Sequence, residues 1–449
     1  MKNRIGLLFI SFLLLFTPFA QANEEYNHIY SIDSPNPAKS SWYGYEVAIN
    51  EDYIVVSEPY GDTDEYNDAG KIYVYEHDGT LVSTIISPTS ENIDLFGHRI
   101  DLSQDKILCG EQTNIDDLKY AGRAHLFNAN GDLVYSFQSN SPSRGGFFGY
   151  SSVSLDSNIM VLSETGAKIN VTGAGRVHLY DPQGNYIKYL ESPSPTNIGK
   201  FGQTVKVGQG LILVGEYGDT SRYAIGNGSV YAFDYSGDHL FTLKAPEPEN
   251  QAIFGHSITL SEKLIVVGEP WATVDDKYRA GQAHIFNKDG EHLFTLNSPN
   301  PKTNGVYGWR LSIDGDIIVV GEWNADVNPS QYEGRAYIYD TEGNLLQNLT
   351  APDPCPRAAF GLDVDICGDL IVVGEYWAAS GELGQAGRVH VYKLGAPPPV
   401  ETQEQGEETT TETVETETDE DDKVGIPGYP ILSILAALII CYLLNIQRK

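Results

Sequence analysis

Short segments with strand character recur along most of this chain, and residues 254–298 show them most clearly. Segments 257–260, 282–286 and 292–296 alternate between apolar and polar side chains, which is the period of a half-buried β-strand. Segment 264–267 is a continuous run of Leu, Ile and Val, typical of a strand buried on both faces. Short turns join the first segment to the second and the third to the fourth, the latter through Asp289-Gly290. No segment has a helical period, so the pattern predicts four antiparallel strands.

This four-strand unit occurs seven times, and three sequence marks recur with a period of 52 or 53 residues. The first mark is the glycine of a Phe/Tyr-Gly pair: Gly44, Gly97, Gly149, Gly202, Gly255, Gly308 and Gly361. The second is a glutamate that ends the continuous apolar run: Glu58, Glu111, Glu164, Glu216, Glu269, Glu322 and Glu375. The third is a glycine before the third strand: Gly70, Gly122, Gly175, Gly228, Gly281, Gly334 and Gly387. Repeats of this kind stack into solenoids or close into rings, and four antiparallel strands per repeat predict an all-β, seven-bladed β-propeller.

The two ends of the repeat region predict how the ring closes. The seventh copy stops after its third strand, at residues 388–394, and is followed by Gly395-Ala396-Pro397. A lone fourth strand at residues 28–32 precedes the first copy, so we expect it to complete the last blade and to remove the open edge. Both short turns then lie on one face of the ring and both long connections on the other. The chain leaves the propeller on the short-turn face.

The flanking segments differ in composition from the repeats and predict an exported, anchored protein. Residues 1–22 resemble a signal peptide with Lys2, Arg4, an apolar stretch and an Ala-Gln-Ala cleavage site; an uncleaved N-terminal membrane helix is the alternative. The propeller is expected over 23–394, followed by a Pro-, Thr- and Glu-rich disordered stalk over 395–424. A transmembrane helix over 425–446 and a basic tail at 447–449 predict a single-pass protein of the cell membrane, with the propeller extracellular and the C-terminus cytoplasmic. A processed C-terminal sorting signal would fit the same residues.

Net charge bears on the choice of partners, whereas cysteines and sequons bear on covalent modification. A formal charge of −32 argues against nucleic acid as a partner, because phosphate contacts would be repulsive. Cys355 and Cys367 lie in the same blade and could form a disulfide in an exported protein. Three sequons could carry N-linked glycans if they are exposed, at Asn170, Asn227 and Asn348.

The repeat resembles the FG-GAP repeats of the integrin α-subunit propeller. Phe254-Gly255 followed by Val267-Gly268-Glu269-Pro270 carries the resemblance best, and Tyr43-Gly44 with Ser57-Glu58-Pro59 repeats it. Glutamate stands where that family usually has alanine. The resemblance covers residues 23–394 and implies an extracellular seven-bladed ring used for protein recognition and adhesion.

The sequence departs from the family at the calcium-binding loops. FG-GAP repeats often carry an Asp-rich calcium loop between the first and second strands, but here that connection is a short turn such as 261–263. The family's calcium sites therefore cannot be carried over, and we expect no cofactor. Asp62, Asp64 and Asp68 in the first long loop are a weak alternative set of oxygen ligands.

The repeated polar and aromatic positions have both structural and functional interpretations. The seven glutamates could form an acidic ring at the channel mouth, but we expect each to accept backbone N–H groups of its own long loop or of the next blade. His125, His178, His284 and His390 alternate with tyrosine at one position of the third strand, and His98 with His256 follow Phe-Gly, which predicts packing roles. Aromatic residues just after the glutamates either pack between blades or bind a ligand: Tyr60, Tyr217, Trp271, Trp323, Tyr376 and Trp377.

The sequence as a whole predicts a membrane-anchored cell-surface binding or adhesion protein. Its long-loop face would recognise an extracellular protein or glycan. We expect no enzyme, because the chain has no G-x-S-x-G, H-E-x-x-H or Walker-type stretch, and no catalytic residues are assigned. A hydrolase or lyase that acts on extracellular polysaccharide is the first alternative, and a structural component of the cell envelope is the second.

Overall fold

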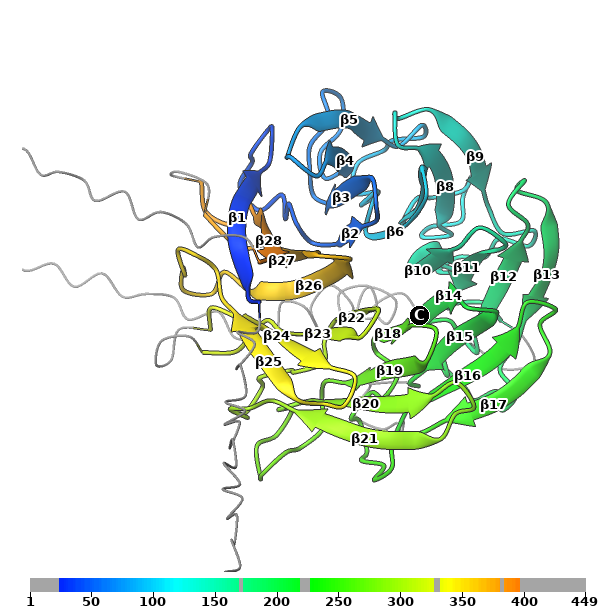
Figure 1. The fold of residues 1–449 in the computed structure, drawn as a ribbon. Coiled ribbons are helices and arrows are strands. Elements are labelled where there is room, and N and C mark those ends of the chain that lie inside the picture. The colour runs from blue at the N-terminus through cyan, green and yellow to red at the C-terminus, as the bar shows by residue number, and fades with distance from the viewer. Residues whose placement is uncertain (1–23, 169–172, 219–226, 327–331, 380–382, 396–449) are drawn as a thin grey trace, which may run out of the picture. The chain divides into compact units, whose positions relative to one another are not determined.

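The computed structural model describes residues 24–168, 173–218, 227–326, 332–379 and 383–395. The chain divides into two units, 1–399 and 400–449, and all described residues belong to the first. These residues form 28 β-strands in seven four-stranded antiparallel sheets, which are the blades of a propeller (Figure 1). Among them no helix is long and apolar enough to cross a membrane. The predicted signal peptide, most of the stalk, the transmembrane helix and the tail lie outside the described residues.

Each of the first six blades is one sequence repeat, with its strands in chain order from the centre outward (Figure 1). Blades 1 and 2 contain β2 (Val47–Ile49), β3 (Tyr53–Glu58), β4 (Lys71–Glu76), β5 (Leu81–Ile86), β6 (Arg99–Ser103), β7 (Lys106–Glu111), β8 (Arg123–Asn128) and β9 (Leu133–Phe137). Blades 3 and 4 contain β10 (Phe148–Leu155), β11 (Met160–Glu164), β12 (Arg176–Tyr180), β13 (Tyr186–Leu190), β14 (Thr204–Gly208), β15 (Leu211–Glu216), β16 (Ser229–Asp234) and β17 (His239–Leu243). Blades 5 and 6 contain β18 (Ile258–Leu260), β19 (Leu264–Glu269), β20 (Gln282–Asn287), β21 (His292–Asn297), β22 (Leu311–Asp314), β23 (Ile317–Glu322), β24 (Arg335–Asp340) and β25 (Leu345–Leu349).

The seventh blade confirms the predicted closure of the ring. It consists of β26 (Phe360–Cys367), β27 (Leu370–Glu375), β28 (Arg388–Leu394) and, as its outermost strand, β1 (Tyr26–Asp33). β1 pairs antiparallel with β28, from Tyr26 opposite Leu394 to Asp33 opposite Arg388. The innermost strands follow one another around the ring, and β26 contacts β2 to complete it.

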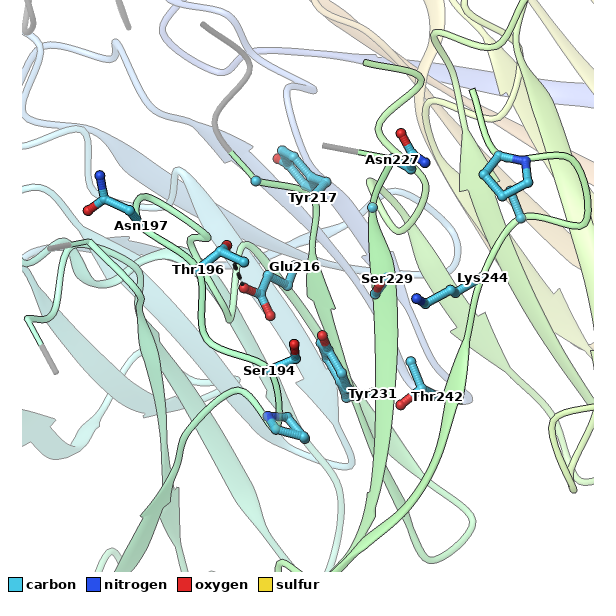
Figure 2. A pocket seen from close by; sticks show the side chains of 15 residues that line it. Ser194, Thr196, Asn197, Glu216, Tyr217, Asn227, Ser229, Tyr231, Thr242 and Lys244 are labelled. Atoms are coloured by element: carbon cyan, nitrogen blue, oxygen red, sulfur yellow. Dashed lines mark hydrogen bonds between the residues drawn. The ribbon is translucent and has the colours of Figure 1, made fainter. Parts of the chain in front are cut away.

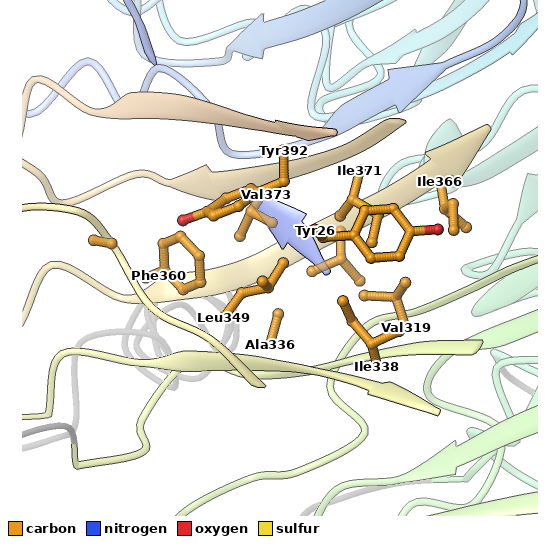
Figure 3. Close-up of a cluster of buried hydrophobic side chains, with 12 residues drawn as sticks. Tyr26, Val319, Ala336, Ile338, Leu349, Phe360, Ile366, Ile371, Val373 and Tyr392 are labelled. Carbon is orange, nitrogen blue, oxygen red and sulfur yellow. The ribbon is translucent and has the colours of Figure 1, made fainter. Parts of the chain in front are cut away.

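Buried residues of neighbouring blades interlock and form the core. The second and third strands of every blade are almost wholly buried, as their continuous apolar sequences predict. Figure 3 shows one inter-blade cluster, in which Tyr26 of β1 and Phe360 of β26 pack with Ile338 of β24. Because each cluster is shared by two blades, a blade has no complete core of its own, which is why such repeats need their neighbours.

The third glycine mark is explained by this blade contact. In every repeat this glycine has a φ of +81° to +94° and lies against the backbone of the Phe or Tyr that begins the next repeat. A β-carbon there would come within 2.0–2.4 Å of that residue's carbonyl oxygen. Gly387 makes the same contact with Tyr43, and thereby joins the last blade to the first. Two of the three sequence marks are therefore the two sides of one junction.

Short polar side chains hold the innermost strands together around the central channel. Asp363 and Asp365 of β26 accept hydrogen bonds from the backbone N–H groups of Val47 and Ile49 at 2.7 and 2.8 Å. Glu46 does the same for Ile100 N–H at 2.9 Å, and Asp101 for Leu155 N–H at 2.9 Å. Inner edge strands leave such donors unpaired, so these carboxylates satisfy buried backbone groups.

Candidate functional site

The long-loop face carries a continuous cluster of aromatic side chains, which we call the aromatic belt. Five of the six aromatic residues singled out in the sequence belong to it: Tyr60, Tyr217, Trp323, Tyr376 and Trp377. Tyr376 and Trp377 have ring centroids 4.8 Å apart, and Trp377 lies 6.5 Å from Trp323. The belt joins loops of blades 1, 4, 6 and 7.

Sequence reasoning missed three of the residues that connect these rings, Trp42, Tyr45 and Trp309. It gave the other two, His98 and His256, packing roles only. Trp42 joins Tyr60 at 4.3 Å to Tyr376 at 5.3 Å, and Trp309 joins Trp323 at 5.9 Å to His256 at 4.2 Å. Tyr45 and His98 extend the belt towards blade 3. All of these residues lie within two positions of a repeat glycine, where aromatic residues are frequent in the repeats, so that position was the available signal.

The belt residues named from the sequence have little solvent exposure. The most exposed apolar side chains lie further along the long loops. Tyr376 is only 1% exposed, and the other belt residues are half-buried. The exposed apolar side chains of the long loops are Ile93 at 58%, Tyr278 at 50%, Tyr332 at 40% and Leu383 at 38%. Large exposed apolar side chains in loops that a rigid scaffold holds are typical of binding surfaces.

Trp271, the sixth predicted residue, is separate from the belt. The guanidinium of Arg279 lies 3.9 Å from the centre of its ring and 5.0 Å from that of Tyr278. Lys302 similarly lies 4.0 Å from the ring centre of Tyr332. Cations therefore sit on these aromatic faces in blades 5 and 6.

A charged network lies below the belt, at the long-loop end of the channel. Glu46 Oε1 accepts hydrogen bonds from Arg99 Nη1 at 2.6 Å and from Arg310 Nη2 at 3.1 Å. Arg310 also pairs with Asp363 at 3.4 Å. Burial raises the pKa of Asp363 to about 7, although the charge of Arg310 lowers it. The pKa values of His98 and His256 are well below the usual range because desolvation and the nearby charges of Arg99 and Arg310 disfavour their protonated forms. At neutral pH the belt therefore presents neutral imidazoles.

The seven repeat glutamates are buried at the ends of the second strands. Glu58 accepts hydrogen bonds from Tyr73 at 2.7 Å and Ser34 at 3.1 Å. Glu164 is bonded to Arg176 at 2.7 Å and His178 at 2.8 Å. Among the described residues these carboxylates are bonded to side chains, so the prediction of backbone N–H partners was wrong. The glutamates link the second strand to the third strand of their own blade, and five of them also bond a hydroxyl just after the fourth strand of the preceding blade.

The third-strand histidines are the partners of these glutamates. His125, His178, His284 and His390 approach Glu111, Glu164, Glu269 and Glu375 through Nε2 at 3.2, 2.8, 2.9 and 2.8 Å. In three of them Nδ1 meets a hydroxyl of the outer strand, on Ser136, Thr295 or Ser31. The packing role predicted from their alternation with tyrosine is thus incomplete, because tyrosine and histidine share a hydrogen-bonding role here.

The three aspartates considered as calcium ligands lie in the first long loop. Asp62 and Asp64 are exposed, and Asp62 accepts the backbone N–H of Asp68 at 2.9 Å. Within the described parts of the chain, no group of three or more His, Cys, Asp or Glu residues is placed to hold a metal ion.

The pairing considered for Cys355 and Cys367 is not made, since both are free thiols. Cys355 precedes β26 and Cys367 ends it.

The three sequons differ in their surroundings. Asn348 is exposed on the outer strand β25. Asn227 is half-buried, and Asn170 lies outside the described residues. Of the described sequons, Asn348 is the one open to modification.

Comparison with known proteins agrees with the repeat structure. The FG-GAP repeat family matches residues 32–75, 296–339 and 344–392. No curated protein matches the chain. Among solved structures, the crystal structure of BamB from Moraxella catarrhalis is similar over 82% of this chain and 100% of that chain, with 14% identity and a TM-score of 0.43. The chain therefore carries FG-GAP repeats on a seven-bladed β-propeller, consistent with an integrin-α-like propeller.

Proposed function

We propose that this protein is a cell-surface binding or adhesion protein whose long-loop face recognises another protein. FG-GAP propellers are a ligand-binding type of fold. The observation that carries the proposal is the aromatic belt, together with the exposed Tyr278, Tyr332, Ile93 and Leu383 around it. Rigid aromatic anchors surrounded by polar loops are typical of the centre of a protein interface.

The packing of the belt favours a protein over a glycan. Trp309 and Trp323 meet with an interplanar angle of 80°, and Trp323 and Trp377 with 79°. In each of these edge-to-face contacts the edge of one ring covers part of the face of the other, which leaves less open ring face in this part of the belt. Stacking on a sugar needs an open ring face, whereas a protein side chain can pack against edges.

The ends of the described chain agree with a tether at the opposite face. Gly395 N–H donates to the carbonyl of Glu25 at 3.0 Å, so the first and last described residues meet beside the short turns. If the flanking residues anchor the protein in a membrane, as the sequence predicts, the long-loop face points away from it.

A test uses immobilised residues 24–395, which contain every strand of the ring, and envelope material of the source cells. We expect specific capture that falls strongly in a Trp323→Ala, Trp377→Ala variant. A matched control, Leu345→Ala with Leu346→Ala, removes exposed apolar side chains from outer strand β25 and should capture normally. Protease treatment of the envelope material should abolish capture. Loss on periodate oxidation but not on proteolysis would instead identify a glycan, and capture unaffected by the Trp variant would contradict the proposal.

A second candidate function is a polysaccharide-acting hydrolase, which one cavity of blade 2 favours. Its volume is about 640 Å³, and Glu91, Asp116 and Asp117 line it together with Lys119 and Arg123. Glycoside hydrolysis commonly uses two carboxylates on either side of the scissile bond. Release of reducing ends from a polysaccharide panel, lost in Asp116→Asn or Asp117→Asn, would support this function. No release by the wild-type chain would exclude it for that panel.

A further inference from the structure

Blade 4 contains a cavity of about 650 Å³ on its long-loop side, which Figure 2 shows from close by. Side chains that line it include Thr196, Glu216, Tyr217, Ser229, Thr242 and Lys244. They come from the ends of β15, β16 and β17 and from the connection between β13 and β14. The cavity lies apart from the charged network of the channel and touches the aromatic belt only through Tyr217.

The cavity exists because blade 4 departs from the repeat at one position. The residue after the third glycine mark is long in every other blade: Lys71, Arg123, Arg176, Gln282, Arg335 and Arg388. In blade 4 it is Ser229. In blade 3 this residue is Arg176, whose Nε donates to the repeat glutamate at 2.7 Å, whereas Arg335 and Arg388 donate to other oxygens of their surroundings. A short serine leaves this volume open beside the carboxylate of Glu216.

Glu216 differs from Glu164 in its hydrogen-bond partners. It resembles Glu58 and Glu322, which are also bonded by hydroxyl groups. Its described hydrogen bonds come from hydroxyl groups, including Ser192 and, at 3.4 Å, Thr196. No arginine or histidine bonds to it among the described residues. Burial raises its pKa, although these hydroxyl groups oppose the effect. A buried carboxylate without a basic partner retains acceptor capacity that a ligand can use.

The basic residue of blade 4 lies instead on the facing strand. Val230 pairs with Leu243, so Ser229 and Lys244 lie at facing ends of β16 and β17. The corresponding outer-strand residues in the other blades are Asp33, Ile86, Gln138, Glu191, Asn297 and Thr350, none of them basic. Lys244 is exposed at the rim of the cavity. The cavity thus combines one carboxylate, one ammonium group and several hydroxyls.

We propose that this cavity binds a neutral sugar unit. Hydroxyl groups of Ser229 and Thr242 can donate and accept, and those of Thr196 and Tyr231, which donate to Glu216, can still accept, as a polyhydroxylated ligand requires. Glu216 accepts from sugar hydroxyls, Lys244 donates from the rim, and Tyr217 supplies apolar contact. Asn227 adds a buried Oδ1 that has no hydrogen-bond partner among the described residues. The volume is in the range of small-molecule sites, ~300–1,000 Å³. Tyr217 is the one described residue of this site that also belongs to the aromatic belt.

The test places in the cavity the arginine that most other repeats hold at the position of Ser229. Ser229→Arg places in blade 4 the side chain that blades 2, 3, 6 and 7 already hold at this position, so the fold should tolerate it. Gln282→Arg is the matched control, since it makes the same kind of change in blade 5. Binding of maltose, cellobiose, lactose and glucuronate to the full chain in detergent is followed by saturation-transfer NMR and calorimetry.

We expect at least one neutral disaccharide to bind the wild-type chain and the Gln282→Arg control alike. Ser229→Arg should weaken that binding about tenfold or more, which corresponds to ~1.4 kcal/mol. If Ser229→Arg does not fold, Thr242→Val should still lower the affinity. Absence of binding by all three disaccharides, unchanged binding in Ser229→Arg or in Thr242→Val, or a preference for glucuronate that depends on Lys244 would each overturn the assignment.

Discussion

Each repeat glutamate has a tyrosine or a histidine of the third strand as its partner. Which of the two is present correlates with the residue just after the fourth strand of the preceding blade. The partner is Tyr73, Tyr231 or Tyr337 for the glutamates of blades 1, 4 and 6. In each case a serine at the end of the preceding blade's fourth strand also donates to the glutamate: Ser34, Ser192 or Ser298. Alanine replaces this serine only at Ala245 and Ala351, at the ends of the fourth strands that precede blades 5 and 7, and in those two blades the partner is histidine. The pattern indicates that tyrosine needs a second hydroxyl donor to satisfy the buried carboxylate and that histidine does not.

The first prediction tests this dependence in blade 5. His284→Tyr keeps an aromatic donor that other blades use, but Ala245 offers no second hydroxyl, so we expect a loss of ~1–2 kcal/mol of stability. Ala245→Ser alone should change little, and added to His284→Tyr it should recover most of the loss. Thermal and urea unfolding of the four chains measure this, and additive effects without recovery would contradict the interpretation.

The second prediction concerns pH and compares two glutamates. Burial raises the pKa of Glu322 from 4.5 to about 7, against hydrogen bonds from Ser298 and Tyr337. The unfolded chain therefore loses this proton first as pH rises, so Glu322 makes the fold progressively less stable between pH 4.5 and 7. Burial also acts on Glu111, but hydrogen bonds and the charge of His125 hold its pKa below 4.5. Its contribution is present above pH 4.5 and is lost as pH falls through the lower, folded value.

Relative to wild type, Glu322→Gln should therefore gain stability as pH rises from about 4.5 to 7. The loss of stability caused by Glu111→Gln should become smaller as pH falls below 4.5. Melting temperatures of both variants and the wild-type chain across this range provide the measurement. Parallel pH curves for the two variants would show that the environments of these carboxylates do not differ as described.

At the scale of the element, β1 connects the start of the chain to its last blade. Tyr26 N–H donates to Gln347 Oε1 at 2.8 Å, and Gln347 Nε2 donates back to the Tyr26 carbonyl at 2.8 Å. Tyr26 and Ile32 are buried in different inter-blade clusters. One strand therefore stabilises the junctions on both sides of the seventh blade.

The third prediction compares two isoleucines of this strand. Ile32 is 9% exposed and Ile29 is 37% exposed. Ile32→Ala should cost ~2–4 kcal/mol through the lost burial and the cavity it leaves, whereas Ile29→Ala should cost under ~0.5 kcal/mol. Chemical unfolding measures both. A similar loss of stability in both variants would contradict the role of β1 in the inter-blade core.

Strand order, closure and the direction of the two faces were predictable from the sequence because they depend on the repeat and on loop length. The aromatic belt was predictable only in part, because contacts such as Trp42 with Tyr376 join loops of different repeats. The glutamate partners lie fourteen or fifteen positions away on a neighbouring strand, and their pairing required the register. The blade 4 cavity arises from Ser229, a small residue at an otherwise long position, and comparison of the seven repeats position by position could have revealed it.

At the scale of the whole molecule, charge inside the channel links blades that are not adjacent. Lys206 of blade 4 contacts Asp101 of blade 2 at 3.1 Å, and Arg310 of blade 6 contacts Glu46 of blade 1 at 3.1 Å. Since Glu46 also contacts Arg99, one carboxylate balances two guanidinium groups. The acidic residues of the channel are therefore parts of the closed ring as well as contributors to its charge.

The fourth prediction removes this carboxylate. Glu46→Ala leaves Arg99 with no carboxylate partner among its described ion pairs, so we expect a loss of ~3–5 kcal/mol of stability. Asp316→Ala, which breaks an exposed pair with Lys263, should cost at most ~1 kcal/mol. Melting temperatures compare the two, and a small effect of Glu46→Ala would show that the network does not hold the ring together.

The most direct test of the account determines which face of the propeller must stay free for binding. Residues 24–395 carrying Cys355→Ser and Cys367→Ser are coupled to a surface through one added thiol. Asp316→Cys places that thiol in a short turn, and Lys277→Cys places it in a long loop. We predict that envelope protein binds the chain coupled at Asp316→Cys and binds at least about tenfold less to the chain coupled at Lys277→Cys. Equal binding, or stronger binding through Lys277→Cys, would contradict recognition by the long-loop face.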